Sequence, residues 1–595
     1  MPSYQAPVAD VLFLLNDVLR MQDHDDLAGY AEASPDIVVA VLDEAAKLAG
    51  QQLQPVNLSG DQEGCRRAAD GSVQTPKGFK AAYDAYAEGG WIGLAFDPAY
   101  GGQGLPYLLA AAVSEFFISA NMSLSMYPGL TAGAAAALLT HGSEELKRLY
   151  APKMLEGRWT GTMNLTEPHC GTDLGLLKTR ATRRDDGSFS LTGQKIFISA
   201  GEHDLTENIV HLVLARIEGA PAGVKGISLF VAPKFLLDAA GNPSEKNAVS
   251  CGSIEHKMGI HGNSTCVMNY DGAQGWLVGE ENRGLNAMFV MMNEARLMVG
   301  VQGLAQSEVA YQNAASYARE RLQGRALTGA KSPEKPADSL LVHPDIRRIL
   351  LEIRAFNEAG RAFALWLALQ SDIAHRSPDA KAREKAADLL GLMTPVLKGV
   401  LTDRGFDNCV KAQQVFGGHG YIVEWGMEQF VRDARIAQIY EGANGIQALD
   451  LVGRKLPANG GRAITAFLTE VGAFLKANDG DEALKPLLGP LSASLGHLQK
   501  ATLWLMQNAL AAPDNAGAAA TDYMHLLGLT ALGYMWAKIA KAAFADADPA
   551  RADFLQAKRA CALFHAERIL PETALRLARI QTGAGVTMSL PAELF

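Results

Sequence analysis

The hydrophobic pattern of this chain changes period twice, and that change constrains the fold more than any other feature. Up to about residue 158, and again after Gly284, apolar residues recur every three to four positions, which is typical of helices. Between Trp159 and Glu280 they alternate every second residue and are interrupted by Gly, Asn and Asp, which is typical of short strands joined by turns. The sequence therefore predicts a mainly α-helical protein with a small central antiparallel sheet or barrel.

Four domains follow from this pattern and from a glycine pair, Gly460 and Gly461, that marks a linker. With 595 residues the chain is too long for one hydrophobic core. We expect an N-terminal helical domain, a middle β domain, a bundle of long helices and an additional helical domain. Their predicted bounds are 1–158, 159–280, 281–458 and 459–595.

Charge and cysteine usage exclude several classes of protein. The net charge is −10, and residues 462–595 hold twelve basic and twelve acidic side chains, which argues against a nucleic-acid-binding surface. The six cysteines form no CxxC pair and the histidines form no HxxxH or HExxH pattern, so we expect reduced thiols and no metal site. The N-terminus has neither a basic nor a long apolar stretch, and no apolar run reaches membrane-spanning length. We therefore expect a cytoplasmic protein without a membrane span.

Four stretches carry residues suited to chemistry, and each has a plain structural alternative. Asn164–Asp173 offers hydroxyls and a glycine where a strand ends, but could be a tight turn. Gly193–Gly201 alternates and carries one aromatic, as would an ordinary strand with a buried Phe. Gln413–Gly420 leads a helix into glycines, which also suits a helix C-cap. Gln438–Gln447 places a lone glutamate between an aromatic and a glycine, although such a residue is usually solvated.

In this order the four stretches resemble the acyl-CoA dehydrogenase family. TEPHCGTD is similar to the family's TEPxxGSD, KIFIS to KxWIT, QVFGGHG to QxxGGxG, and YEGANGIQ to YEGTxxIQ. The resemblance covers about residues 75–457, and the longer ends resemble the larger bacterial members, including the 3-methylmercaptopropionyl-CoA dehydrogenases. It implies a helical domain, a β-barrel-like domain and a four-helix bundle, plus the extra C-terminal helices. It also implies bound FAD and a homodimer or higher homo-oligomer.

The resemblance implies α,β-dehydrogenation of an acyl-CoA thioester to a trans-2-enoyl-CoA. Glu441 matches the family's base for the α-proton, and Gly442 lets the acyl chain pass close by. The backbone N–H of Glu441 would stabilise the charge on the thioester oxygen. The β-hydride would pass to flavin N5, and the electrons to an electron-transfer flavoprotein. Some relatives carry the base immediately before an Arg on an earlier helix, but here Ala295 precedes Arg296 and Glu294 is one residue off, which favours Glu441.

The cofactor and substrate contacts follow by matching motifs. The residues matched to FAD contacts are Leu165, Thr166, Gly171, Thr172, Phe197, Ile198, Ser199, Arg321, Gln323, Gln414, Gly417, Gly418, Ala443 and Asn444, and those matched to substrate contacts are Thr172, Arg296 and Gly442. Arg321 matches a residue that reaches the FAD pyrophosphate of the neighbouring subunit, a role that suits a guanidinium; a surface arginine is the alternative. The chain departs from the family pattern by carrying Thr172 for Ser, Phe197 for Trp and Ala443 for Thr, and by lacking the Phe that usually follows Arg321.

Two other functions stay open at this stage. An acyl-CoA oxidase shares the fold and the base, and oxidases often carry a C-terminal extension. A flavin-carrying, nucleic-acid-binding relative would need a basic surface, which the neutral C-terminal block does not supply. The acyl group is also open, between 3-methylmercaptopropionyl-CoA and medium- or long-chain fatty acyl-CoA, because cavity depth depends on residues scattered over several helices.

Overall fold

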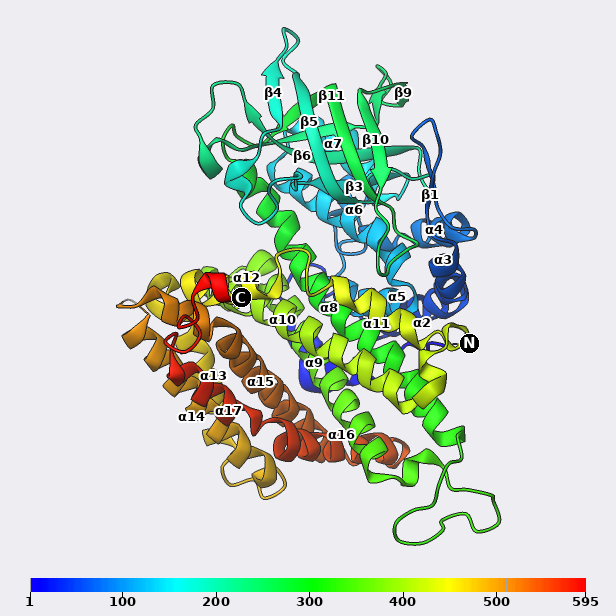
Figure 1. Cartoon of the computed structure of the whole chain (residues 1–595), viewed down its shortest axis with the longest axis vertical. Helices are drawn as coiled ribbons and strands as arrows, with labels where there is room; N and C mark the ends of the chain where they lie inside the picture. The colour runs from blue at the N-terminus through cyan, green and yellow to red at the C-terminus, as the bar shows by residue number, and fades with distance from the viewer. Residues whose placement is uncertain (1, 510) are drawn as a thin grey trace. The chain divides into compact units, whose positions relative to one another are not determined.

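The computed structural model describes residues 2–509 and 511–595, apart from the side chain of Glu294. Its elements fall into two compact units, one of residues Ala40–Met298 and one that joins the chain up to Val39 with Val299–Phe595. The first unit holds all the strands and the second holds most of the long helices (Figure 1). This confirms the predicted fold class of helical regions around a central β domain. The domain boundaries at 158, 280 and 458 remain predictions.

A closed barrel forms the centre of the Ala40–Met298 unit. Strand β11 pairs with β5 and β7, β5 pairs with β4, and β6 pairs with β4 and β7, so five strands close a ring. β3 extends the ring from β6 and β10 extends it from β11. The strands are β3 Trp159–Asn164, β4 Arg180–Arg183, β5 Phe189–Ser199, β6 Asn208–Ile217, β7 Ser228–Pro233, β10 Val249–Ile254 and β11 Thr265–Val278, with the short pairs β1 Arg66–Arg67 with β2 Val73–Gln74 and β8 Phe235–Leu237 with β9 Pro243–Lys246.

The barrel differs from the predicted antiparallel sheet in two pairs of strands. β3 and β4 both lie parallel to β6. Parallel neighbours need a long connection between them, and the segment from Leu165 to Glu207, which includes the β4–β5 hairpin, supplies it for β3 and β6. Alternation of apolar residues reveals a strand but not the direction of its partner, so the sequence could not separate the two cases.

Side chains from both sides of the barrel fill its interior. Phe189 and Phe230 meet edge to face with centroids 4.9 Å apart, among buried residues that include Leu191 and Val213. The helices of this unit are α3 Asn57–Glu63, α4 Phe79–Glu88, α5 Tyr107–Ala120, α6 Met122–His141 and α7 Glu144–Leu155, and α2 Pro35–Leu48 spans the boundary between the units.

Helix α6 packs directly on strand β3. A Cβ at Gly161 would come within 2.5 Å of the Ala134 Cβ, so glycine permits this approach. Among the helices of the described residues, α6 is the one that is long and apolar enough to cross a membrane, but 72% of its apolar window is buried in the structure. The sequence analysis found no segment of that length. The apolar composition of α6 is explained by its place in the core of this unit.

The other unit consists of helices, several of them more than thirty residues long. They are α1 Val8–Phe13, α9 Pro344–Arg376, α10 Ala380–Val415, α11 Met427–Ile436, α12 Asn444–Asp450, α13 Arg462–Ala477, α14 Lys485–Asn508, α15 Pro513–Ala545, α16 Ala552–Phe564 and α17 Glu572–Thr582, and α8 Gly284–Glu320 runs through both units. Gly460 and Gly461 have φ angles of 70° and 78° and lie in the turn between α12 and α13, inside one compact unit, so their role as a linker between domains remains a prediction.

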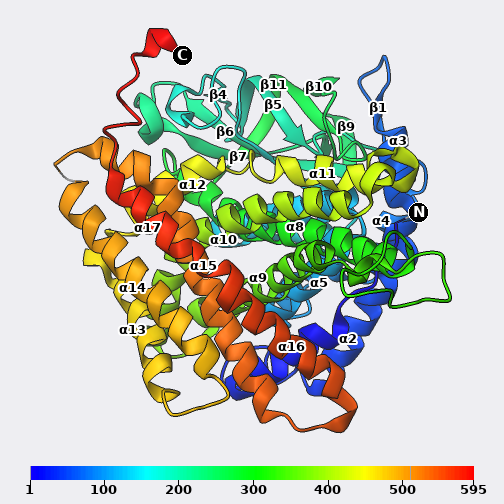
Figure 2. The same cartoon turned by 60° about the horizontal axis from the view of Figure 1, so that its bottom comes forward.

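Helices α8 and α10 pack closely where two glycines face each other. A Cβ at Gly405 would lie 2.2 Å from the carbonyl oxygen of Gly303, so only a glycine fits there. The added helices α14, α15 and α17 lie side by side against this bundle (Figures 1 and 2). Trp536 of α15 donates from Nε1 to the carbonyl of Ala355 on α9 at 2.9 Å. The C-terminal block is therefore part of the same packed helical unit.

Candidate active site

Two of the four sequence motifs meet inside the β-barrel unit through a buried lysine. Lys195 of the second motif donates from Nζ to Glu167 Oε1 at 2.9 Å and to the carbonyl of Leu165 at 3.0 Å. Burial lowers the pKa of Lys195 to about 8, although Glu167 opposes the shift. The amide of Ile196 also donates to the carbonyl of Thr166 at 2.9 Å. The strand and the loop that were matched to FAD contacts are therefore held together.

Glu167 is the centre of this arrangement. It accepts from the Thr179 hydroxyl at 2.6 Å and from the backbone amides of Lys178 and Thr179. Burial would raise the pKa of Glu167, but the charge of Lys195 and these hydrogen bonds hold it below its usual value. Glu167, His169 and Cys170 bring possible metal-ligand atoms within 4.8 Å of one another, but both carboxylate oxygens of Glu167 are already engaged.

A β-bulge in β5 changes the direction of the Phe197 side chain, the aromatic residue of the second motif. Cys266 pairs with Ile198 and Met268 with Lys195, so two residues of β5 face one residue of β11. Within the bulge Phe197 has a φ of 58°, a left-handed conformation that costs about 1–3 kcal/mol for a residue with a side chain. Phe197 is 59% exposed, whereas the next residue, Ile198, is buried. A strained backbone that presents an aromatic ring on the outside of a barrel fits a platform for a flat ligand.

The remaining cofactor residues of this unit lie along the same loop and strand. Gly171 and Thr172 are exposed, and Leu165, Thr166 and Ser199 are half-buried. A Cβ at Gly171 would meet the Thr166 Cγ2 at 3.4 Å, so the turn folds back on its own start.

Glu441 lies in the helical unit, in the short connection between α11 and α12. It is half-buried and has a φ of 54°, followed by Gly442 at 88°. Two consecutive left-handed residues make a sharp turn that a helix or strand could not provide. The preceding residue, Tyr440, donates its hydroxyl to Gln302 of α8. Burial, with the charge of Glu441 beside it, raises the pKa of the Tyr440 hydroxyl, which keeps it a neutral donor.

Side chains of α10 and α12 hold the carbonyls of this turn. Gln447 donates from Nε2 to the carbonyls of Glu441 at 3.1 Å and Gly442 at 3.3 Å. Lys398, which is fully buried, donates to the Gly442 carbonyl at 2.8 Å and to Asn444 Oδ1 at 2.7 Å. A Cβ at Gly442 would lie 2.4 Å from Gln447 Nε2, so glycine is required for this contact. The buried Oε1 of Gln447 has no partner among the described residues.

Two residues matched to FAD contacts in this turn have other visible roles. Asn444 is buried, and its amide is engaged with the side chains of Lys398, Asp403 and Thr402. Ala443 occupies the N-cap of α12, where no side chain of the described residues caps the helix. The contacts of both residues with FAD remain predictions.

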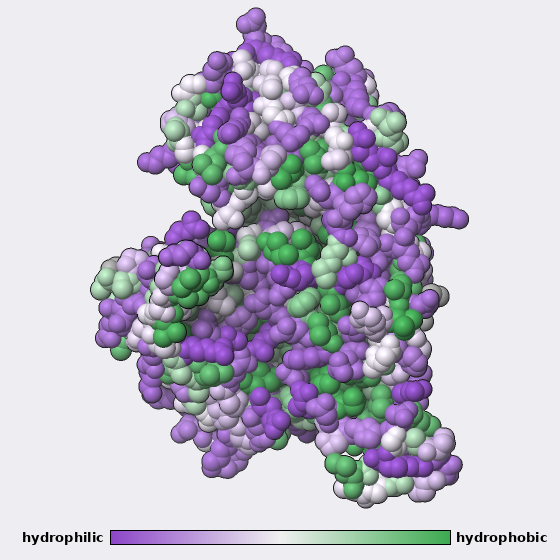
Figure 3. All heavy atoms as spheres, in the orientation of Figure 1, coloured by the Kyte–Doolittle hydropathy of each residue, from purple (hydrophilic) through white to green (hydrophobic). Residues whose placement is uncertain are grey.

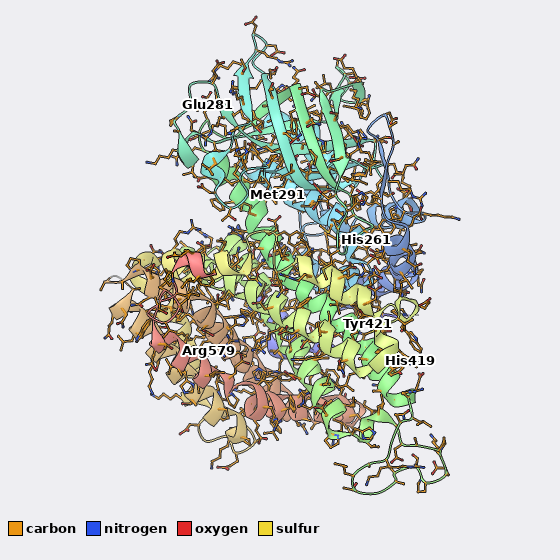
Figure 4. All side chains as sticks on the ribbon, in the orientation of Figure 1. His261, Glu281, Met291, His419, Tyr421 and Arg579 are labelled. Atoms are coloured by element: carbon orange, nitrogen blue, oxygen red, sulfur yellow. The ribbon has the colours of Figure 1, made fainter. Side chains whose placement is uncertain are left out.

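The third motif and Arg321 come together at one edge of the helical unit. Tyr317 stacks on Phe416 with ring centroids 4.1 Å apart and donates or accepts a hydrogen bond with His419 Nδ1 at 2.8 Å. Figure 4 shows His419 and Tyr421 at this edge. The residues at the edge that were matched to the neighbouring subunit's FAD, Arg321, Gln323, Gln414, Gly417 and Gly418, are all exposed. Their side chains are thus accessible to a second molecule.

Arg296 is half-buried on the part of α8 that belongs to the β-barrel unit. The rival base Glu294 has its side chain outside the described residues. Sequence reasoning missed Lys398, Gln302 and the carboxylate of Asp403, which support the Glu441 turn. They are single polar residues within long helices, and no pattern in the sequence marks them as partners of the Glu441 turn.

Comparisons with known proteins agree with this arrangement. Family models match the chain in succession: "Acyl-CoA dehydrogenase, N-terminal domain" over residues 40–158, "middle domain" over 162–273, "C-terminal domain" over 282–456 and "Acetyl-CoA dehydrogenase C-terminal like" over 467–591. The chain is 42% identical over 580 residues to the 3-methylmercaptopropionyl-CoA dehydrogenase of Ruegeria pomeroyi, covering 97% of this chain and 98% of that protein. It is 34% identical to the broad-specificity linear acyl-CoA dehydrogenase of Mycobacterium tuberculosis, with 96% of each covered.

Solved structures share the fold at lower identity. ACDH-11 of Caenorhabditis elegans in complex with C11-CoA gives a TM-score of 0.79 at 20% identity, covering 96% of this chain and 92% of that chain. An acyl-CoA dehydrogenase of Bacillus anthracis complexed with FAD gives 0.71 at 20% identity, with 92% of each covered. Fold and family matches together define an FAD-dependent class of oxidoreductase. The chain belongs to the acyl-CoA dehydrogenase family.

Proposed function

We propose that this chain removes the α-proton and β-hydride of an acyl-CoA thioester, with Glu441 as the base. The observation that carries the proposal is the Glu441 turn. Glu441 is half-buried and has a left-handed backbone. Gln447 donates to the carbonyl of Glu441, and Lys398 donates to the carbonyl of Gly442. A backbone fixed in this way sets the position from which the Glu441 side chain reaches the substrate.

The chemistry requires a carboxylate of raised basicity against a weakly acidic carbon. Glu441 is half-buried, so its carboxylate can act on Cα where bulk water has limited access. As the proton leaves, negative charge develops on the thioester oxygen, and the backbone N–H of Glu441 is the donor we assign to it. Gly442 adds no side chain beside the acyl group, and we assign Arg296 and Thr172 to substrate contacts.

The residues present fit FAD. Phe197 offers an exposed aromatic side chain on a strained bulge. The loop of the first motif, residues 165–173 (the TEP loop), is bonded to the same strand and offers hydroxyls and a glycine. In the β-barrel unit the residues we assign to FAD are Leu165, Thr166, Gly171, Thr172, Phe197, Ile198 and Ser199. In the Glu441 turn they are Ala443 and Asn444. Bound FAD supplies the acceptor for the hydride from Cβ.

A homodimer, or a higher homo-oligomer, would complete the site. Exposed apolar side chains follow the third motif without a break: Tyr421 at 84%, Ile422 at 47% and Val423 at 52%. In the space-filling view, hydrophobic patches interrupt the hydrophilic surface over the long helices (Figure 3). Arg321, Gln323, Gln414, Gly417 and Gly418 would then reach the partner's FAD. Light scattering of Ile422→Asp should report a smaller particle than the unchanged protein, with less bound FAD.

The substrate we favour is 3-methylmercaptopropionyl-CoA, because the relative named for it is 42% identical over nearly the whole chain. A medium- or long-chain fatty acyl-CoA is the second candidate, given the broad-specificity relative at 34%. Initial rates over a series of acyl-CoA lengths that includes the methylthio compound would rank them. An electron-transfer flavoprotein is the proposed electron acceptor, and the cytoplasm the proposed compartment.

The direct test is anaerobic mixing of the purified protein with acyl-CoA. The protein should be yellow, and the substrate should bleach it without oxygen. Absence of bleaching with every straight-chain and methylthio acyl-CoA would overturn the proposal. Rapid oxygen consumption with substrate and no other acceptor would instead indicate an acyl-CoA oxidase.

A further inference from the structure

One carboxylate of the neighbouring helix α10 accepts hydrogen bonds from both ends of the turn that carries Glu441. Asp403 Oδ1 accepts from Gln438 Nε2 at 2.8 Å and from Asn444 Nδ2 at 2.7 Å. The backbone amide of Asn444 also donates to the carbonyl of Gln438 at 3.1 Å, which closes the segment between them. The position of Glu441 therefore depends on where the Asp403 carboxylate lies.

The other oxygen of that carboxylate is held from the additional C-terminal helices. His525 of α15 lies 2.9 Å from Asp403 Oδ2 through its Nε2, and its side chain is 7% exposed. Its Nδ1 is buried and has no partner among the described residues. Because Asp403 needs a donor, the proton belongs on Nε2. Together with Gln438 and Asn444, His525 holds the pKa of Asp403 below its usual value, against the effect of burial, so the acceptor stays ionised.

Close packing of α15 on α10 brings the two residues together. A Cβ at Gly399 of α10 would lie 2.4 Å from the Met524 sulfur, and a Cβ at Gly528 of α15 would lie 2.6 Å from a methyl of Val400. Both glycines let α10 and α15 approach closely, in the same stretch of the two helices that carries Asp403 and His525.

We propose that the C-terminal helices position the catalytic base: His525 orients Asp403, and Asp403 holds both ends of the Glu441 turn. His525 and Asp403 are then positioning residues, and the additional domain contributes to turnover without touching substrate. The inference rests on the proposed role of Glu441 and assigns a role to the C-terminal block.

The test uses the full-length holoenzyme with His525→Ala, His525→Gln and Asp403→Asn. Gln can place an N–H donor where His525 Nε2 lies, whereas Ala cannot, and Asn at 403 keeps the size but loses an acceptor. His497→Ala is the matched control, because His497 of α14 bonds Thr573 Oγ1 at 3.0 Å within the C-terminal helices alone. FAD content and unfolding midpoint are measured for each. Steady-state kinetics with butyryl-CoA and 3-methylmercaptopropionyl-CoA give kcat and KM.

A second readout isolates the base. Exchange of the α-hydrogen of butyryl-CoA for deuterium in D2O, followed by mass spectrometry, reports proton removal without requiring turnover. His525→Ala and Asp403→Asn should lower kcat and the exchange rate together by about 10- to 100-fold, as a misplaced group does, with KM and FAD content little changed. His525→Gln should recover most of both rates, and His497→Ala should leave them unchanged.

Each contrary outcome has a distinct meaning. Unchanged kcat and exchange in both His525→Ala and Asp403→Asn would overturn the inference, as would a loss in His525→Ala that His497→Ala reproduces or that Gln fails to recover. Glu441→Gln, run alongside, separates the two proposals. If it abolishes exchange while the His525 and Asp403 variants are normal, only the positioning role fails. If it leaves exchange intact, the assignment of the base fails and the inference fails with it.

Discussion

Lys195 Nζ lies 2.9 Å from Glu167 Oε1, and both side chains are almost completely buried. The pair joins two motifs that are nearly thirty residues apart in sequence, since Lys195 also binds the Leu165 carbonyl. Removing one partner of a buried ion pair strands the other charge in a medium of low polarity.

Lys195→Met should therefore destabilise the β-barrel unit by about 3–5 kcal/mol, because Glu167 loses its counter-ion. FAD content should fall as well, because the TEP loop loses the hydrogen bond from Lys195 to the Leu165 carbonyl. Urea unfolding measures the change. The double variant Lys195→Met with Glu167→Gln should recover part of the loss, since no buried charge then remains. A single variant as stable as the unchanged protein would show that the pair does not hold the loop.

Phe197→Gly should raise stability and weaken cofactor binding at once. Glycine adopts a φ of 58° without the cost that Phe197 bears, so the free energy of unfolding of the FAD-free protein should rise by about 1 kcal/mol. FAD affinity should fall because the exposed ring is lost. Thermal unfolding of the FAD-free protein and flavin titration measure the two effects. Lower stability together with unchanged affinity would contradict the assignment of this residue.

Ala443→Thr should stabilise the protein. Ala443 has the extended backbone of an N-cap, with φ −51° and ψ 149°, and offers no side chain to the first turn of α12. A threonine hydroxyl there can accept from a backbone amide, which is worth about 0.5–2 kcal/mol. Denaturant unfolding compared with Ala443→Val, which has a similar shape but no hydroxyl, measures the gain. Equal stability of the Thr and Val variants would rule out capping.

Asp338→Asn should reveal a stability contribution that depends on pH. Burial would raise the pKa of Asp338, but donation from the amides of Ala326, Lys331 and Ser332 lowers it to about 2. Unfolded aspartate has a pKa of about 3.9, so the folded group is depressed and its contribution is complete above that value. The contribution is lost as the pH falls from about 4 to about 2.

The difference in unfolding free energy between the unchanged protein and Asp338→Asn should thus be constant near neutral pH and shrink below pH ~4. The Asp338 backbone pairs with Gln323 and Gly324, so this loop also supports the residues beside Arg321. Urea unfolding at a series of pH values provides the measurement. A difference that grows on acidification would give the opposite sign and exclude the depressed pKa.

Much of this fold follows from the sequence because periodicity and glycine positions are local signals. The alternation between Trp159 and Glu280 indicated the barrel, and Gly460 and Gly461 indicated the turn before α13. The parallel pairing of β3 and β4 with β6 did not follow, because strand direction depends on long-range connections.

The site was only partly predictable, for a related reason. The resemblance to the family's motifs pointed to Glu441 and Phe197, but nothing in the sequence indicates that both have a left-handed backbone, since neither is a glycine. Lys398, Asp403 and His525 act through tertiary contacts between helices distant in sequence. Such support becomes visible only when α10, α12 and α15 are packed together.

Anaerobic rapid mixing of Glu441→Gln with acyl-CoA tests the central claim most directly. The amide keeps the size of the side chain but cannot take a proton, so the variant should bind FAD, remain yellow and bleach about 10²–10⁴-fold more slowly than the unchanged protein. Glu441→Asp, which keeps a carboxylate on a shorter arm, should fall between the two. Bleaching of Glu441→Gln at the rate of the unchanged protein would contradict the account, because the α-proton would then be removed by another group.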